Sequence, residues 1–206
     1  MQLKQVKVEY ILVRILYFLP MFFLKKKYKK AGLNFLVKYP FKILNPQYII
    51  VGNRFRVFKN ARIECINSYG IQKFTPQLLI GNNVTINNNV HIGVINKVVI
   101  EDNVLLASYV YISDHSHGDY GTLLNTNPKV APSKREIIST GPVVIGENSW
   151  IGEGVKILPN VTIGKGCIVG ANAVVSRNIP NYSIAAGVPA KVIKKFNFKK
   201  AIWETV

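Results

Sequence analysis

The chain has 206 residues, of which 49% are hydrophobic and 18% are charged. This length suits one substantial domain with a small appendage, and the composition excludes an intrinsically disordered chain and a coiled coil. Lysine and arginine number 27 against 10 acidic residues, which gives a formal net charge of +17. Such a surplus favours an anionic partner: a membrane surface, a nucleic acid, or an acidic or phosphate-bearing ligand.

The first 45 residues are predicted to form an N-terminal helical and basic segment. The stretch YILVRILYFLPMFFL (10–24) is apolar and is followed by KKKYKK (25–30). It is short for a membrane span, it contains Arg14, and no small-residue cleavage site follows it. Two interpretations stay open: a helix packed on the main domain, or an amphipathic helix whose lysines face anionic headgroups. The second implies a cytoplasmic protein in peripheral contact with the inner face of the cell membrane.

An aliphatic residue then recurs every six positions, with interruptions. The series is Val51, Val57 and Ile63; Ile80, Ile86 and Ile92; Ile100, Leu106 and Ile112; and Ile145, Ile151, Ile157, Ile163, Val169 and Val175. The residue four positions later is small or β-branched in most hexads. A period of six fits neither an amphipathic helix nor an alternating strand, but it fits a β-solenoid in which three hexads close one triangular coil. We therefore predict an all-β parallel β-helix over residues 46–195, followed by a C-terminal tail over 196–206.

The hexad register breaks between Ile112 and Ile145, which lie 33 positions apart. Three hexads would need 18 positions, so about 15 residues are extra and residues 114–141 are predicted to form a protruding loop. Long loops in compact repeats are usually functional or disordered. The segment ISDHSHGDYG (112–121), at the start of this loop, carries two of the three histidines of the chain.

Three interpretations of His115 and His117 follow from chemistry. The pair could belong to a polar loop, or it could bind a metal together with His91, because alternate side chains on a strand point the same way. It could also supply a general base, because a neutral imidazole accepts a proton near neutral pH. Asp114 and Asp119 flank the pair, and either carboxylate could orient a ring. The buried position expected for Cys167 favours a packed core thiol over a nucleophile.

The hexads IGENSW, IGEGVK and IGKGCI and the tail VVSRNIPNYSIAAGVPAKVIKK (174–195) resemble the hexapeptide-repeat acetyltransferases, which form left-handed β-helices. The resemblance covers about residues 50–195 and is strongest to sugar O-acetyltransferases that modify galactosides, maltose, nodulation factors, capsule or lipopolysaccharide. It implies transfer of acetyl from acetyl-CoA to a hydroxyl of a capsule, O-antigen or other surface glycan. It also implies a homotrimer with active sites between subunits and no metal. Nucleic acid is not an expected partner, because no recognition motif accompanies the basic charge.

Two alternatives to this activity remain open. One is an N-acetyltransferase acting on a nucleotide-linked amino sugar, which would use the same base. The other is a metal-binding solenoid similar to carbonic anhydrases of this shape.

The resemblance also assigns catalytic residues. Aligned without gaps, the segment DNVLLASYVYIS (102–113) places the base at His117, with His115 as the second choice. Direct attack of the sugar hydroxyl on the thioester is expected, with no acyl-enzyme. Trp150, in the WIG motif, is expected beside the catalytic histidine and acetyl-CoA, and a backbone amide near residues 151–153 is expected to stabilise the oxyanion.

Acceptor and cofactor residues follow from the same resemblance. Asn87, in TINNNV, is expected to contact the acceptor, together with Asp114 and Asp119. A carboxylate that the sugar acetyltransferases place a few residues later is missing, since Ile95 and Asn96 stand there, and this leaves the identity of the acceptor open. The residues expected to bind the cofactor are Trp150, Gly152, Glu153, Gly170, Ala171, Ser176, Arg177, Ala186 and Lys191.

Overall fold

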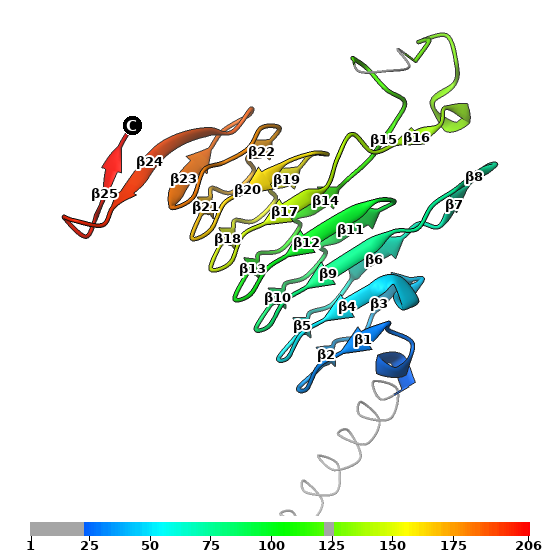
Figure 1. Ribbon diagram of the computed structural model, residues 1–206, viewed down its shortest axis with the longest axis horizontal. Helices are drawn as coiled ribbons and strands as arrows, with labels where there is room; N and C mark the ends of the chain where they lie inside the picture. The colour runs from blue at the N-terminus through cyan, green and yellow to red at the C-terminus, as the bar shows by residue number, and fades with distance from the viewer. Residues whose placement is uncertain (1–22, 122–125) are drawn as a thin grey trace, which may run out of the picture.

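The computed structural model describes residues 23–121 and 126–206. The apolar segment predicted at 10–24 lies almost entirely outside these ranges, and the described part of the chain enters through a short helix at 23–26. No helix in the two described ranges is long and apolar enough to cross a membrane. The chain then winds into a stack of coils, as Figure 1 shows from the N-terminal end in blue to the C-terminal end in red.

Three parallel sheets form the sides of the stack, and each coil passes through sheets A, B and C in turn. Sheet A contains β1 (Lys30–Ala31), β4 (Ile49–Val51), β9 (Gln77–Ile80), β12 (Lys97–Ile100), β17 (Val143–Ile145) and β20 (Thr162–Ile163). Sheet B contains β2 (Leu36–Val37), β5 (Arg56–Val57), β10 (Thr85–Ile86), β13 (Leu105–Leu106), β18 (Trp150–Ile151), β21 (Ile168–Val169) and β23 (Ser183–Ala186). Sheet C contains β3 (Phe41–Leu44), β6 (Ala61–Cys65), β11 (His91–Val94), β14 (Tyr111–Ser113), β19 (Lys156–Ile157) and β22 (Val174–Val175).

The aliphatic residues of the hexads fill the interior, as predicted. None of the residues in the series that runs from Val51 to Val175 is more than 3% exposed. The small residues four positions later are buried as well, including Cys167. Every coil therefore stacks its apolar side chains on those of the next coil, and hydrophobic burial favours the continuous stack.

Asparagine ladders hold the corners between sheets A and B. Asn83, Asn103 and Asn148 have φ values of 58°, 59° and 59°, in the left-handed region that asparagine tolerates. Asn83 Nδ2 donates to Asn103 Oδ1 at 2.8 Å, and Asn103 Nδ2 donates to Asn148 Oδ1 at 3.0 Å. The asparagines of the hexads thus serve the turn and the stacking of successive coils together.

The solenoid begins earlier than residue 46, where the sequence analysis placed its start. Ala31 pairs with Val51, Val37 with Val57, and Ile43 with Ile63, so β1, β2 and β3 form a first coil. At the other end, β24 (Lys191–Asn197) and β25 (Ile202–Thr205) add antiparallel to β23 on sheet B. The predicted tail over 196–206 is therefore largely part of this sheet.

Two excursions leave the stack where sheet C leads into sheet A, which we call the C–A edge. One is the hairpin of β7 (Ser68–Tyr69) and β8 (Gln72–Lys73), and the other runs from β15 (Ser116–His117) to β16 (Ile137–Ile138). Figure 1 shows both projecting from the same side of the stack. Tyr69 Oη donates to the carbonyl of Ser133 at 2.7 Å, and Ile137 N–H donates to Gln72 Oε1 at 2.9 Å. The hairpin therefore supports the longer loop. Short 3-10 turns lie at η1 (Pro46–Tyr48) and η2 (Pro132–Lys134).

Candidate active site

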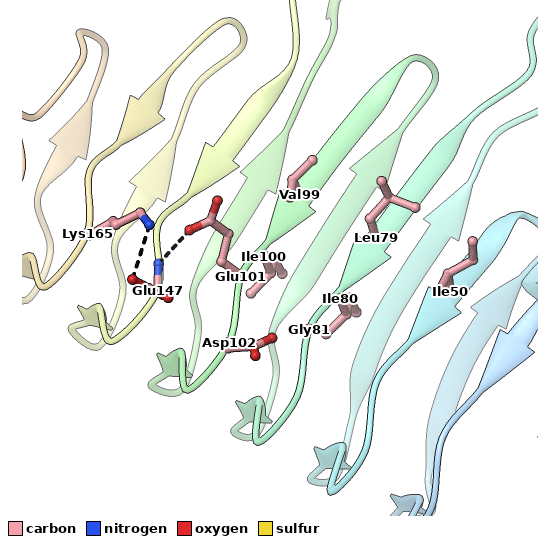
Figure 2. Close-up of a pocket in the computed structure, with 10 residues that line it drawn as sticks. All are labelled: Ile50, Leu79, Ile80, Gly81, Val99, Ile100, Glu101, Asp102, Glu147 and Lys165. Carbon is pink, nitrogen blue, oxygen red and sulfur yellow. Dashed lines mark hydrogen bonds and ion pairs between the residues drawn. The ribbon is translucent and has the colours of Figure 1, made fainter.

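Two hollows on the outside of the prism differ in chemistry. One, of about 460 Å³, lies on sheet A over Ile50, Leu79 and Val99 (Figure 2). Its charged groups stand at one end, where Lys165 Nζ pairs with Glu147 Oε1 at 3.1 Å, and no histidine lines it. The other, of about 590 Å³, lies on sheet C at the C–A edge and is lined by all three histidines of the chain. The second hollow, called the histidine cleft below, is the one equipped for proton transfer.

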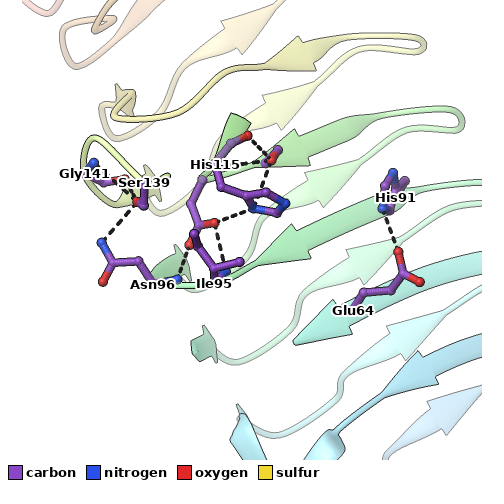
Figure 3. Close-up of polar contacts among 9 residues, drawn as sticks. Glu64, His91, Ile95, Asn96, His115, Ser139 and Gly141 are labelled. Atoms are coloured by element: carbon purple, nitrogen blue, oxygen red, sulfur yellow. Dashed lines mark hydrogen bonds and ion pairs between the residues drawn. The ribbon is translucent and has the colours of Figure 1, made fainter. Parts of the chain in front are cut away.

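A buried carboxylate holds His115 in the histidine cleft. The chain bends at Asp114, after β14, and Asp114 Oδ1 lies 2.9 Å from His115 Nδ1. Figure 3 shows His115 next to Ile95 and Asn96. The Asp114 side chain is 0% exposed, and its two oxygens accept hydrogen bonds from the backbone N–H groups of Ile95 and Asn96 at 3.0 and 2.8 Å. A carboxylate only accepts hydrogen bonds, so Nδ1 carries the proton of the ring and Nε2 keeps its lone pair.

The surroundings of His115 fix its ring further. Ser113 Oγ accepts from the backbone N–H of His115 at 3.2 Å and donates to its carbonyl at 2.8 Å. Beneath the ring lies Gly93, where a Cβ would come within 3.1 Å of His115 Cε1. A side chain at position 93 would crowd the His115 ring. The His115 side chain is 13% exposed. His115 is therefore accessible from the cleft and has the orientation of a general base.

His117 lies in a different setting. Its residue is exposed, its backbone pairs with Ile137 across β15 and β16, and its ring packs edge-to-face on Tyr69 with centroids 5.3 Å apart. Asp119 is buried, but its Oδ1 accepts from Gly121 N–H at 3.3 Å and so folds the loop locally. His117 thus packs the excursion against the supporting hairpin.

His91 occupies the far side of the cleft. Its Nε2 lies 3.2 Å from Glu64 Oε2, and Arg62 Nη2 lies 2.9 Å from His91 Nδ1. Burial lowers the pKa of His91, and the charge of Arg62 adds to this effect, so that together they outweigh the opposing influence of Glu64. Among the described residues no group of three or more His, Cys, Asp or Glu side chains is arranged to hold a metal ion. The three histidines instead have separate partners.

The two cysteines are core residues. Cys65 and Cys167 are buried, as predicted for Cys167. Burial raises the pKa of the Cys65 thiol to about 12 and also raises the pKa of Cys167. Neither group is available as a thiolate nucleophile at neutral pH.

Most of the residues predicted to bind the cofactor line the opposite edge of sheet C, where sheet B leads into it. At this B–C edge Gly152, Gly170 and Ala186 stack on one another. A Cβ at Gly152 would lie 2.6 Å from the carbonyl of Val169, and one at Gly170 would lie 3.1 Å from Ala186 Cβ. Because these residues have small side chains or none, a ligand can approach the backbone closely along this edge. The N–H of Gly152 donates to Val169 O at 2.8 Å, so the ladder already uses it.

The predicted site residues are consequently divided between two edges. Asn87, Glu153, Ala171 and Lys191 belong with the B–C edge, and Trp150 lies beside it on the outer face of sheet B, 49% exposed. Ser176 and Arg177 follow β22, so they lie at the C–A edge with His115. About five residues of extended chain separate the edges, or roughly 16 Å at ~3.3 Å per residue. A single chain therefore does not bring Trp150 to either histidine.

Arg62, Glu64 and Gly93 belong to this cleft but were not predicted from the sequence. The hexad pattern could have identified them, because the residues on either side of the inward Ile63 and Ile92 must point outwards.

Comparison with known proteins agrees with this architecture. Residues 142–177 match the family model described as bacterial transferase hexapeptide (six repeats). The chain is 38% identical over 170 residues to the putative lipopolysaccharide biosynthesis O-acetyl transferase WbbJ of Escherichia coli (strain K12), covering 82% of this chain and 83% of that protein.

The chain belongs to the hexapeptide-repeat acetyltransferase family. The left-handed β-helix and the enzyme class predicted from sequence, an acetyltransferase that uses acetyl-CoA, are confirmed.

Two solved structures are also similar to the chain. A maltose O-acetyltransferase from Clostridium difficile 630 aligns with a TM-score of 0.54 at 27% identity, covering 84% of this chain and 73% of that one. The second is a point mutant of AntD, an N-acyltransferase from Bacillus cereus, in complex with dTDP-4-amino-4,6-dideoxyglucose and coenzyme A. It aligns with a TM-score of 0.61 at 25% identity, covering 88% of this chain and 91% of that one.

Proposed function

We propose that this acetyltransferase esterifies a hydroxyl group of a surface carbohydrate, and that His115 is its general base in preference to His117. The Asp114–His115 pair in the histidine cleft carries this proposal. His115 Nε2 removes the proton of the sugar hydroxyl as its oxygen attacks the thioester carbonyl carbon of acetyl-CoA. The C–S bond breaks, and the departing thiolate recovers the proton from the imidazolium. The products are the sugar acetate and CoA with a free thiol.

Asp114 is a positioning residue in this reaction. Its carboxylate fixes the Nδ1–H tautomer and stabilises the imidazolium that forms during the transfer. Two backbone N–H groups in turn hold the carboxylate, so the pair needs no rearrangement before the reaction. We assign Asp114 to this role rather than to the acceptor contact expected from sequence.

The test of the activity combines thiol release with product analysis. Purified protein is incubated with acetyl-CoA and surface glycans, free thiol is followed with a chromogenic reagent, and acetylated glycan is detected by mass spectrometry. We expect glycan-dependent thiol release that the His115→Ala variant loses. Thiol release that is equal in the two proteins would contradict the assignment of the base.

We also propose a homotrimer in which His115 of one chain faces Trp150 and the B–C edge of the next. The separation of these residues within one chain supports it, because a heterologous ring would bring the two edges together. In this arrangement the backbone of Gly152, Gly170 and Ala186 borders the pantetheine arm, and Lys191 lies near the phosphates of CoA.

Subunit mixing tests this arrangement. His115→Ala and Trp150→Ala chains are inactive or weak alone, but in mixed trimers about a quarter of the interfaces would pair two intact residues. Activity should appear on mixing after dissociation and reassembly. A mixture that stays as inactive as its components would show that the two residues do not share a site.

A second candidate reaction is N-acylation of an amino sugar, which the similarity to AntD favours. The same imidazole would take a proton from the attacking amine. Mild alkali separates the two products, since it cleaves an O-acetyl ester and leaves an N-acetyl amide intact.

We further propose peripheral contact between the N-terminal basic run and anionic membranes. Lys26, Lys27, Lys29 and Lys30 are exposed beside Tyr28, whose ring is buried in the first coil. Each lysine near an anionic surface contributes about 1 kcal/mol. At low salt the protein should sediment with phosphatidylserine-containing vesicles, and a variant with these lysines changed to glutamine should stay in the supernatant. Equal retention on neutral vesicles would count against the proposal.

A further inference from the structure

The outer face of sheet C carries a row of cationic and aromatic side chains that the reaction above does not use. The strand register places one residue of each coil in this row: Lys42 pairs with Arg62, Arg62 with His91, His91 with Tyr111, and Tyr111 with Lys156. The His91 and Tyr111 rings meet edge-to-face with centroids 5.2 Å apart. The row crosses the floor of the histidine cleft and continues towards the N-terminal coils.

Glu64 organises the cationic end of this row. Its carboxylate lies 2.7 Å from Lys42 Nζ and 3.1 Å from Arg62 Nε, and its side chain is only 14% exposed. Burial alone raises the pKa of Glu64, but the hydrogen bond from Lys42 and the charges of Arg62 and Lys42 outweigh this, and the pKa is lowered. Two cations therefore face one anion. Burial lowers the pKa of His91, which favours the neutral form of this ring.

The cations remain available to a ligand. The side chains of Lys42 and Arg62 are 65% and 51% exposed. A guanidinium has five N–H donors, and the contacts with Glu64 and His91 involve only Nε and Nη2. Glu64 thus holds the guanidinium in place while an edge of it still faces the cleft.

A short span of sheet C separates this charged pair from the base. Glu64, Gly93 and Ser113 stand at the same register on three neighbouring strands, and His115 follows Ser113. Two strand spacings of ~4.8 Å put about 10 Å between the outer positions. Gly93, in the middle of this span, has no side chain, and a Cβ there would lie 3.8 Å from Nε2 of both His115 and His91. Figure 3 shows His115 and, farther along the sheet, His91 and Glu64. A sugar residue in the cleft against His115 Nε2 could extend past His91 towards the cations, because the three groups line one hollow.

We propose that the acceptor is an anionic glycan, and that Arg62 and Lys42 bind a carboxylate of the sugar residue next to the hydroxyl that His115 deprotonates. The inference deepens the proposed function and rests on it. Arginine suits this role because its planar donors match the two oxygens of a carboxylate. The formal net charge of +17 on the whole chain would also attract a chain of repeated carboxylates.

The test uses oligogalacturonate and its methyl ester, which have the same sugar chain with and without the charge. Affinity is measured by calorimetry on the full chain without acetyl-CoA, and acetyl transfer is measured separately. We expect the acid to bind at least about 10-fold more tightly than the ester, as a charge-assisted hydrogen bond of ~1.5–3 kcal/mol implies. Arg62→Gln should remove most of this preference for the acid, and Lys42→Gln should reduce the preference about 3-fold. In both variants binding of the ester should be unchanged.

Arg56→Gln is the matched control, because Arg56 lies in the same coil but on the outer face of sheet B. Equal affinity for acid and ester, or an equal loss in Arg56→Gln and Arg62→Gln, would overturn the inference. His115→Ala keeps the two proposals apart, since it should bind the acid like the unmodified protein while losing transfer. If the protein acetylates the ester as readily as the acid, the acceptor inference fails and the proposed function stands. If it binds the acid selectively but releases no CoA with any glycan, the proposed function fails.

Discussion

His115 and His117 are separated by one residue, yet they occupy different physical environments. His115 follows a bend at the end of a solenoid strand, and the buried carboxylate of Asp114 holds its ring. His117 belongs to the excursion, where its ring rests on Tyr69 of the neighbouring hairpin. The rigid coil provides a fixed imidazole, and the loop provides a packed but exposed one. A general base works best when its ring is held in one orientation, so the imidazole that Asp114 fixes is the better candidate.

The largest effect on kcat is expected at Asp114, the residue that holds the ring of His115 but not that of His117. Asp114→Asn should lower kcat by about 10²-fold, because an amide cannot both fix the tautomer and stabilise the imidazolium. Steady-state kinetics with a pH profile would check this. Asp119→Asn is the control, since Asp119 folds the loop around Gly121, and its kcat should stay within about 3-fold of that of the unmodified enzyme. A comparable drop in both variants would remove the distinction.

A smaller effect is expected beneath the ring of His115. Gly93→Ala places a Cβ about 3.1 Å from His115 Cε1, so the ring must shift by a few tenths of an ångström. We expect kcat to fall about 10-fold with the KM for acetyl-CoA unchanged. The double variant with His115→Ala should be no slower than His115→Ala alone, because Gly93 acts through that ring. Additive losses would mean that Gly93 serves another purpose.

Around His117, a substitution is expected to affect stability rather than catalysis. Tyr69→Ala removes the ring under His117 and the hydrogen bond to Ser133. The excursion should become more susceptible to limited proteolysis, with a loss of stability of about 1 kcal/mol and an activity within about 3-fold of the starting value. Proteolysis and thermal unfolding would be measured together. Activity as low as that of Asp114→Asn would instead connect the hairpin to catalysis.

The smallest effect concerns pH and the charged cluster around Glu64. Its pKa is lowered in the folded chain, so its contribution to stability is present above the unfolded value of about 4.3 and is lost as pH falls through the folded value. Glu64→Gln should therefore lower the thermal midpoint at pH 7 but hardly change it near pH 3. A difference that persists at low pH would show that packing, rather than charge, is lost.

Much of this architecture could be read from sequence. The period of six identified the inward residues because burial imposes it on every coil. The first coil was missed even though Ala31, Val37 and Ile43 keep the same period, since the preceding apolar run and lysines favoured a helical and basic segment. The hairpin that supports the excursion was missed as well, because its contact with Ser133 joins segments far apart in sequence.

The choice between the histidines illustrates the limit. An alignment without gaps places the base at His117, whereas the geometry favours His115, and the bend at Asp114 makes the difference. No local pattern announces that the backbone of Ile95 and Asn96 will receive the carboxylate of Asp114. Those two residues interrupt the hexads by a short insertion, and their function is visible only when neighbouring coils are stacked.

The most direct test of the account is the rate of acetyl transfer in His115→Ala and His117→Ala, measured side by side with the same glycan and acetyl-CoA. The account predicts a loss of about 10²–10⁴-fold for His115→Ala, the usual contribution of a general base, and a change within about 3-fold for His117→Ala. A large loss in His117→Ala with nearly full activity in His115→Ala would contradict it.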